Sequence, residues 1–116
     1  MIFSEIAREF YVDSRKLTDY ALNSDNPKGK DKAIMFQAHL GFTCDNYEGL
    51  LQQIKEQILN ANAIFQREDQ YGKHYQVDLE IKGVILEQQE IVRTGWVIPP
   101  DSNIARLVTL YVRKRK

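Results

Sequence analysis

The hydrophobic period of this chain changes from about 3.6 residues to two near residue 62, and this change strongly constrains the fold. Between residues 47 and 61 the apolar residues recur at the spacing of one helix face. They are Tyr47, Leu50, Leu51, Ile54, Ile58 and Ala61. From Tyr75 to Ile81 apolar and polar residues alternate, which is typical of a strand buried on one side. This order predicts helices followed by a sheet, the α+β class.

Two shorter helices are predicted before this change. The first spans residues 15–22, because Asp13 and Ser14 favour a helix start and the apolar residues that follow repeat at helical spacing. The second spans residues 31–40. Its predicted core face is Ala33, Phe36 and Leu40.

Two more strands are predicted after Ile81. They span residues 90–98 and 105–112, and Pro99-Pro100 forces a loop between them because proline cannot continue a ladder. Residues 63–67 can add an edge strand. The prediction is therefore N-terminal helices packed on one face of a three- to four-stranded antiparallel meander.

A length of 116 residues predicts one domain, which we place at residues 13–112. Residues 1–12 form an arm whose apolar side chains must pack on the body or on a second subunit. The basic tail, residues 113–116, carries four positive charges, so the rest of this neutral chain carries four net negative charges. The tail could bind phosphates or simply be solvated. A basic body of the kind that grips duplex DNA is not present.

The composition predicts a cytoplasmic protein without a membrane segment. No apolar run reaches 18 residues, and the N-terminus lacks the basic region and long apolar core of a signal peptide. The single cysteine, Cys44, cannot form a disulfide within the chain, which fits a reducing compartment. We interpret Cys44 as structural.

Three lysines, Lys28, Lys30 and Lys32, lie within five residues at the start of the predicted helix 31–40. Cations there oppose the positive end of the helix dipole. Gly29 frees the backbone, so the lysines and the amides that follow could bind a phosphate. The spacing does not match a Walker loop, and a solvated loop is the other interpretation.

The chain has two histidines, His39 and His74. His39 borders the core face of its helix, which favours a packed, hydrogen-bonded side chain. His74 begins a strand after a glycine-containing turn, so it is a candidate acid or base. The histidines and the cysteine show no metal-ligand spacing, and we predict no metal and no cofactor.

Arginine on a predicted strand is costly unless it is paired or faces a polar cleft. Arg93 and Arg106 could clamp a phosphate, which guanidinium matches bidentately. Asp78 or Glu80 could instead pair with them across strands. The other polar candidates on these strands are Thr94, Thr109 and Tyr111.

Several short patterns occur together in this chain. They are Lys16-Leu-x-x-Tyr20-x-Leu22-Asn23, Gly29-x-x-Lys32-Ala33-x-x-Phe36, Leu40-Gly41, Tyr71-Gly72-x-x-Tyr75-x-Val77-Asp78, Arg93-Thr94-x-Trp96 and Ala105-Arg106-Leu107-Val108-Thr109. As a set, they resemble a small bacterial domain family of unknown function that is common in cyanobacteria. That family is distantly similar to the barnase–EndoU–colicin–RelE ribonuclease fold, in which helices precede a twisted antiparallel sheet.

The resemblance implies a toxin that cuts RNA without a metal. By this resemblance Lys32 would neutralise the charge that develops on the phosphate, and Lys28 and Lys30 would bind phosphate. Arg93 and Arg106 would hold the scissile phosphate, and His74 would act as acid or base. Thr109 and Tyr111 would donate hydrogen bonds.

Two hypotheses follow. The first is a metal-independent ribonuclease, the toxin of a toxin–antitoxin-like pair, with RNA as substrate and an antitoxin or immunity protein as partner. The second is a non-catalytic module that binds a partner protein or forms a homodimer. Asn26 separates them, because the related sequences often have a histidine just before this Pro-x-Gly turn and a nuclease should not lose its base.

Overall fold

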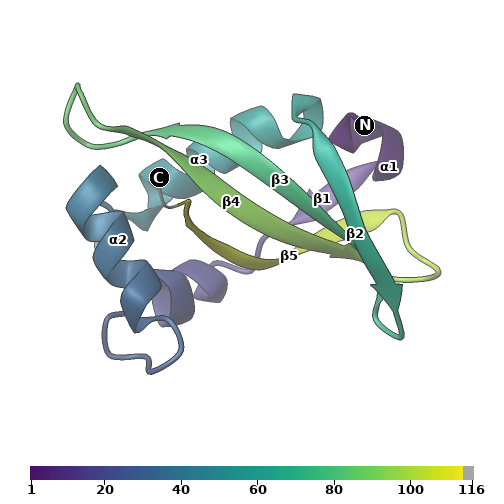
Figure 1. The fold of residues 1–116 in the computed structure, drawn as a ribbon, viewed down its shortest axis with the longest axis horizontal. Helices are drawn as coiled ribbons and strands as arrows, with labels where there is room; N and C mark the ends of the chain where they lie inside the picture. The colour runs from purple at the N-terminus through teal and green to yellow at the C-terminus, as the bar shows by residue number, and fades with distance from the viewer. Residues whose placement is uncertain (114–116) are drawn as a thin grey trace.

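The computed structural model describes residues 1–113 and confirms the α+β class (Figure 1). Lys114 to Lys116 of the predicted basic tail lie outside the described residues. The elements in chain order are α1 (Phe3–Ile6), β1 (Glu9–Tyr11), the π-helix η1 (Lys16–Ala21), α2 (Lys30–Leu40), α3 (Tyr47–Gln57), the 3-10 helix η2 (Ile58–Asn60), β2 (Ala63–Asp69), β3 (Gly72–Lys82), β4 (Gln89–Ile98) and β5 (Ile104–Val112). No helix within residues 1–113 is long and apolar enough to cross a membrane.

The sheet has five strands in the order β1-β5-β4-β3-β2. Strands β2 to β5 form the predicted antiparallel meander. The additional strand is β1, which pairs in parallel with β5 and comes from the segment predicted to be an arm. The prediction of a purely antiparallel sheet of three to four strands missed it, because a strand of three residues is too short to show a period of two.

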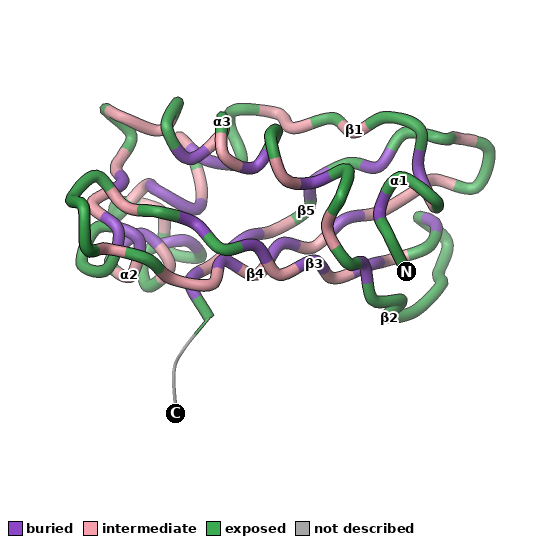
Figure 2. The backbone as a smooth tube through the Cα atoms, turned by 90° about the horizontal axis from the view of Figure 1, so that it is seen from above, coloured by how far each residue is buried: buried purple, intermediate pink, exposed green. Residues whose placement is uncertain are grey.

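Helices α1 and α3 lie on one side of the central strands (Figure 2). Between these helices and the sheet lies the core, and α2 contributes its predicted face of Ala33, Phe36 and Leu40, each at most 5% exposed. We call this side of the sheet the core face. The opposite side, which we call the open face, carries the residues that alternate with the buried ones.

The N-terminal segment is anchored on Trp96 in the core. Phe3 is fully buried and meets the Trp96 ring edge-on at 5.3 Å between ring centroids. The indole N–H of Trp96 donates to the hydroxyl of Thr94 at 2.7 Å, and that hydroxyl donates to the carbonyl of Val77 at 2.7 Å. Trp96 is therefore a core residue with a satisfied polar group, as expected for a buried tryptophan.

Candidate functional site

The open face presents its side chains in rows that cross the strands. From β3 to β5, the register gives the rows Asp78–Arg93–Tyr111, Gln76–Gly95–Thr109 and His74–Val97–Arg106. Neighbouring rows are two residues apart along β3 and β4, about 6.6 Å. Gly95 stands in the middle of this grid and has no side chain, so the face is hollowed there.

A β-bulge brings the β5 residues of these rows to one face. Gly95 pairs with Thr109 and Trp96 pairs with Leu107, so Val108 is an extra residue in β5. Strict alternation would put Arg106 and Thr109, three residues apart, on opposite faces. The bulge reverses the alternation between them and leaves both on the open face.

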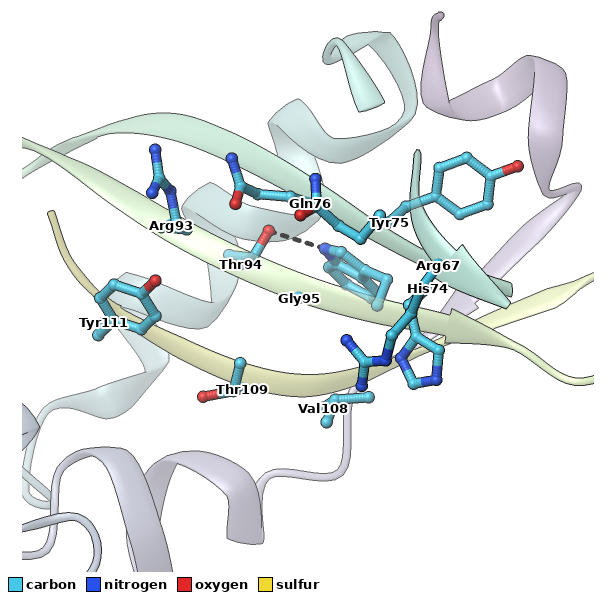
Figure 3. Close-up of a pocket in the computed structure, with 12 residues that line it drawn as sticks. Arg67, His74, Tyr75, Gln76, Arg93, Thr94, Gly95, Val108, Thr109 and Tyr111 are labelled. Atoms are coloured by element: carbon cyan, nitrogen blue, oxygen red, sulfur yellow. Dashed lines mark hydrogen bonds between the residues drawn. The ribbon is translucent and has the colours of Figure 1, made fainter. Parts of the chain in front are cut away.

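The Gly95 hollow is a cavity of about 200 Å³. Side chains from β2 to β5 surround Gly95 in Figure 3. They include Arg67, His74, Gln76, Arg93, Val108, Thr109 and Tyr111. None of the described residues that line the hollow is acidic, and two of them are arginines. The hollow is therefore suited to an anion or to a group attached to one.

Arg93 is held in place by Asp78, its neighbour in the row. Its Nε and Nη2 donate to the two Asp78 carboxylate oxygens at 3.0 and 3.2 Å, and Arg113 donates to the same carboxylate at 3.2 Å. The hydrogen bond to Asp78 raises the pKa of Arg93 above its usual value. The sequence left two alternatives for Arg93, a cross-strand pair or a position beside a polar cleft. The structure shows both, since Arg93 pairs with Asp78 and also lines the hollow.

His74 is oriented by Asp69 at the β2–β3 turn. The distance from its Nε2 to the Asp69 carboxylate is 3.0 Å, and Arg67 lies 3.6 Å from the same carboxylate. Partial desolvation opposes ionisation of Asp69, but hydrogen bonds from His74 and from the Tyr71 amide outweigh it and lower the pKa of Asp69. With Nε2 bonded to Asp69, Nδ1 is the ring nitrogen left to exchange a proton, as in an acid or base oriented by a carboxylate.

Lys32 reaches the edge of this site from α2. Strand β1 covers only Ile104–Arg106 of β5, so η1 and α2 can pack beside the rest of that strand. The Lys32 ammonium donates to the Tyr20 hydroxyl and lies 5.7 Å from the centroid of the Tyr111 ring. The hydrogen bond from Lys32 lowers the pKa of Tyr20. A hydrogen bond with Thr109 lowers it further, and desolvation by burial opposes both.

The loop before α2 packs against η1, the helix that carries Tyr20. Asn26 donates to the carbonyl of Asp19 and accepts from the amide of Lys28, each at 2.8 Å, so it joins this loop to η1. A Cβ atom on Gly29 would lie 2.0 Å from the carbonyl oxygen of Tyr20, so only glycine allows this approach. Asn26 thus has a structural role here.

Lys28 and Lys30 are exposed and do not line the hollow. Lys30 is two residues from Lys32 on a helix, a rotation of about 200°, so it points away from the side that Lys32 faces. Lys28 precedes the helix. The three lysines therefore do not converge on one point.

The model of a domain of unknown function, DUF6883, matches residues 4–114. The chain belongs to the DUF6883 family. No curated protein matches it.

One solved structure shares the fold of this DUF6883 domain. It is described as a contact-dependent growth inhibition toxin–immunity protein complex from Klebsiella pneumoniae 342. The TM-score is 0.65 and the sequence identity 16%, with 88% of this chain and 98% of the other covered. This similarity establishes a shared fold.

The hollow of the DUF6883 domain brings together four of the residues proposed from the sequence: His74, Arg93, Thr109 and Tyr111. Lys32 adjoins them through Tyr111, and the two residues also share a second cavity with Arg93. Arg106 lies in the row of Val97 and does not line the hollow.

The residues of this site that sequence reasoning missed include Arg67, Gln76, Gly95, Val108 and Tyr20. Only Gly95 carried a usable signal, because a glycine inside a strand often marks a place where a ligand or another backbone approaches closely. The others follow from pairings between segments that are distant in the sequence.

The remaining candidates of the DUF6883 domain lie outside the hollow. His39 is half-exposed on α2, 3.6 Å from Glu90. The Cys44 thiol donates to the carbonyls of Thr18 and Leu22, and burial raises its pKa, which favours the thiol over the reactive thiolate. Residues 1–113 contain no group of three or more potential metal ligands.

Proposed function

We propose that this DUF6883 domain is a metal-independent endoribonuclease, the toxin of a toxin–antitoxin-like pair. The observation that carries the proposal is the Gly95 hollow, in which a carboxylate-oriented histidine lies among arginines and hydroxyl groups with no acidic lining residue. RNA cleavage by its own 2′-hydroxyl needs a base, an acid and positive charge on the phosphate. The hollow contains residue types for each of these tasks.

Each side chain has a task in this proposal. His74 exchanges a proton with the 2′-hydroxyl or the leaving oxygen through Nδ1. Arg93 and Lys32 stabilise the charge that develops on the phosphate, and Thr109 and Tyr111 donate hydrogen bonds to its oxygens.

Arg106 does not line the hollow, although it shares a row with His74, which does. In the proposal Arg106 therefore binds the neighbouring phosphate of the RNA. Lys28 and Lys30 bind phosphates further along the RNA strand. These contacts would position the RNA without taking part in the chemistry.

The proposed partner is an antitoxin or immunity protein. The solved structure that shares this fold is a toxin–immunity protein complex, which supports a protein partner for this chain. A partner that covers the open face would block access to the hollow.

The experiment is to express the chain in bacteria and to measure growth and total RNA integrity. We expect slow growth and cleaved RNA with the wild type, and loss of both with Lys32→Ala and Arg93→Ala. Arg106→Ala should lose part of the activity. Lys55→Ala, an exposed lysine of α3 on the other side of the sheet, is the matched control. A wild type that neither slows growth nor cuts RNA would rule out the toxin, and toxicity in all three variants would rule out these residues.

A non-catalytic module that binds a partner or a second copy is the second candidate. It is favoured by the ion pairs of Asp78 and Asp69, which already neutralise basic side chains at the hollow. The variant Asp78→Asn separates the two candidates. It should strengthen RNA binding by a ribonuclease, since it releases Arg93 and Arg113, and it should leave a protein-binding module without measurable RNA affinity.

A further inference from the structure

We infer that the Gly95 hollow is a nucleobase subsite and that Gln76 reads the edge of the base. This inference rests on the proposed function, because it names the part of the RNA that enters the hollow. It assigns base selectivity to Gln76, a residue for which the proposed chemistry has no task.

The shape of the hollow fits a planar group. On β4, Arg93 and Val97 are four residues apart, about 13 Å, and on the flanking strands Gln76 and Thr109 stand about 9.6 Å apart, two strand spacings. Gln76, Arg93 and Thr109 line this space above the Gly95 backbone, and we call it the slot. A Cβ on Gly95 would already come within 3.0 Å of the Thr109 methyl group. In this inference a flat ring stands on the glycine and fills this slot.

The polar groups of the slot match the edge of a base. Among residues 1–113 the Gln76 amide has no hydrogen-bond partner, although the side chain is half-buried. An amide offers one donor and one acceptor side by side, which is the pattern that pairs with adenine N7 and N6. Thr109 faces it from the other side of Gly95 with its methyl group. The row therefore favours adenine over the other bases.

The neighbouring row supplies the rest of a nucleotide. Arg93 lies one row from Gly95, about 6.6 Å along β4, and carries the guanidinium that would meet a phosphate. The Tyr111 ring in the same row can contact the sugar or the face of the base. A base over Gly95 and a phosphate at Arg93 thus belong to one nucleotide.

The test compares cleavage of four oligoribonucleotides that differ only in the base at the cleaved position. We expect the wild type to prefer adenine by about tenfold or more, the discrimination of one bidentate contact. Gln76→Glu removes the donor and should move the preference toward cytosine, whose amino group a carboxylate accepts. Gln76→Ala should flatten the preference, and Gln37→Glu, an exposed glutamine of α2, should leave it unchanged. A ratio of the four rates that stays within about twofold of wild type in both Gln76 variants would overturn the inference and leave the ribonuclease intact.

A second measurement keeps the inference testable if the chain cuts no RNA. Adenosine 3′-monophosphate, cytidine 3′-monophosphate and inorganic phosphate are titrated separately into the protein, and the amide signals of Gly95 and the Gln76 side chain are followed by NMR. Shifts caused by the adenosine nucleotide alone, and lost in Gly95→Ala with the fold retained, would support the subsite while the ribonuclease fails. Equal shifts with all three ligands, or none, would overturn it.

Discussion

The two faces of the sheet are made of alternate residues of the same strands, yet they differ in almost every property. On the core face Val77, Leu79 and Val92 are at most 2% exposed. On the open face Asp78 and Arg93, which adjoin these residues along β3 and β4, are polar, half-buried and joined by an ion pair. Neighbouring residues of one strand point to different faces. A substitution can therefore change the stability of the fold without changing the candidate site, or the reverse. Substitutions on the core face should unfold the protein, and substitutions on the open face should disable it.

The largest expected effect comes from a matched pair on β5. Leu110 is fully buried on the core face, and Val108 at the bulge is 39% exposed. Leu110→Ala should lower the free energy of unfolding by about 2–5 kcal/mol because it leaves a cavity. Val108→Ala should change it by less than about 1 kcal/mol. Urea unfolding measures both, and equal losses would show that the two faces do not differ in packing.

The second largest expected effect comes from Arg93 on the open face. Arg93→Ala should reduce RNA cleavage about 100-fold, which is about 2.7 kcal/mol of transition-state stabilisation, because the phosphate loses its guanidinium. Its free energy of unfolding should change by less than about 1 kcal/mol, since the pair with Asp78 is partly exposed.

Arg106→Ala serves as the comparison on the same face. It should reduce cleavage less than about tenfold, because it contacts a neighbouring phosphate outside the reaction. Rates are measured with purified proteins of equal folded fraction. A loss in Arg106→Ala as large as that in Arg93→Ala would place the scissile phosphate between the two rows.

A smaller effect concerns Thr94, the buried polar residue of the core face among residues 1–113. Thr94→Val should lower the free energy of unfolding by about 1–3 kcal/mol because it leaves the Trp96 indole N–H without an acceptor. Thr94→Ser keeps the hydroxyl and should cost about 1 kcal/mol for one methyl group. Urea unfolding followed by Trp96 fluorescence gives both values, and a Val variant as stable as wild type would show that this hydrogen bond has no net effect.

The smallest effect is spectroscopic and tests the link between Lys32 and Tyr20. The pKa of Tyr20 is lowered in the folded state, so one tyrosine should ionise before the others in an alkaline absorbance titration. Tyr20→Phe should remove that early step, and Lys32→Met should move it to higher pH. The linked stabilisation is absent at neutral pH, where folded and unfolded chains both hold the proton, and it is complete above the unfolded pKa of about 10. An unchanged titration curve in Lys32→Met would mean that the hydrogen bond does not persist in solution.

Part of the candidate site could be predicted from the sequence. Arg93, Thr109 and Tyr111 were identified because polar residues on a predicted strand need an explanation, and His74 because it begins one. The pairings that define the hollow could not be predicted, because Gln76, Gly95 and Thr109 come from three strands and meet through register alone. Lys28 and Lys30 were grouped with Lys32 by proximity in the chain, and helix geometry then separates them.

The sequence by itself determined the α+β class, the positions of α2, α3 and the meander strands, and the buried face of α2. These depend on periodicity, a local property that each segment carries in its own residues. Only the tertiary structure decided that β1 joins the sheet in parallel, that a bulge at Val108 turns Arg106 and Thr109 to one face, and that Tyr20 holds Lys32 beside them. These features depend on hydrogen bonds between segments distant in the chain, so no single stretch of sequence encodes them.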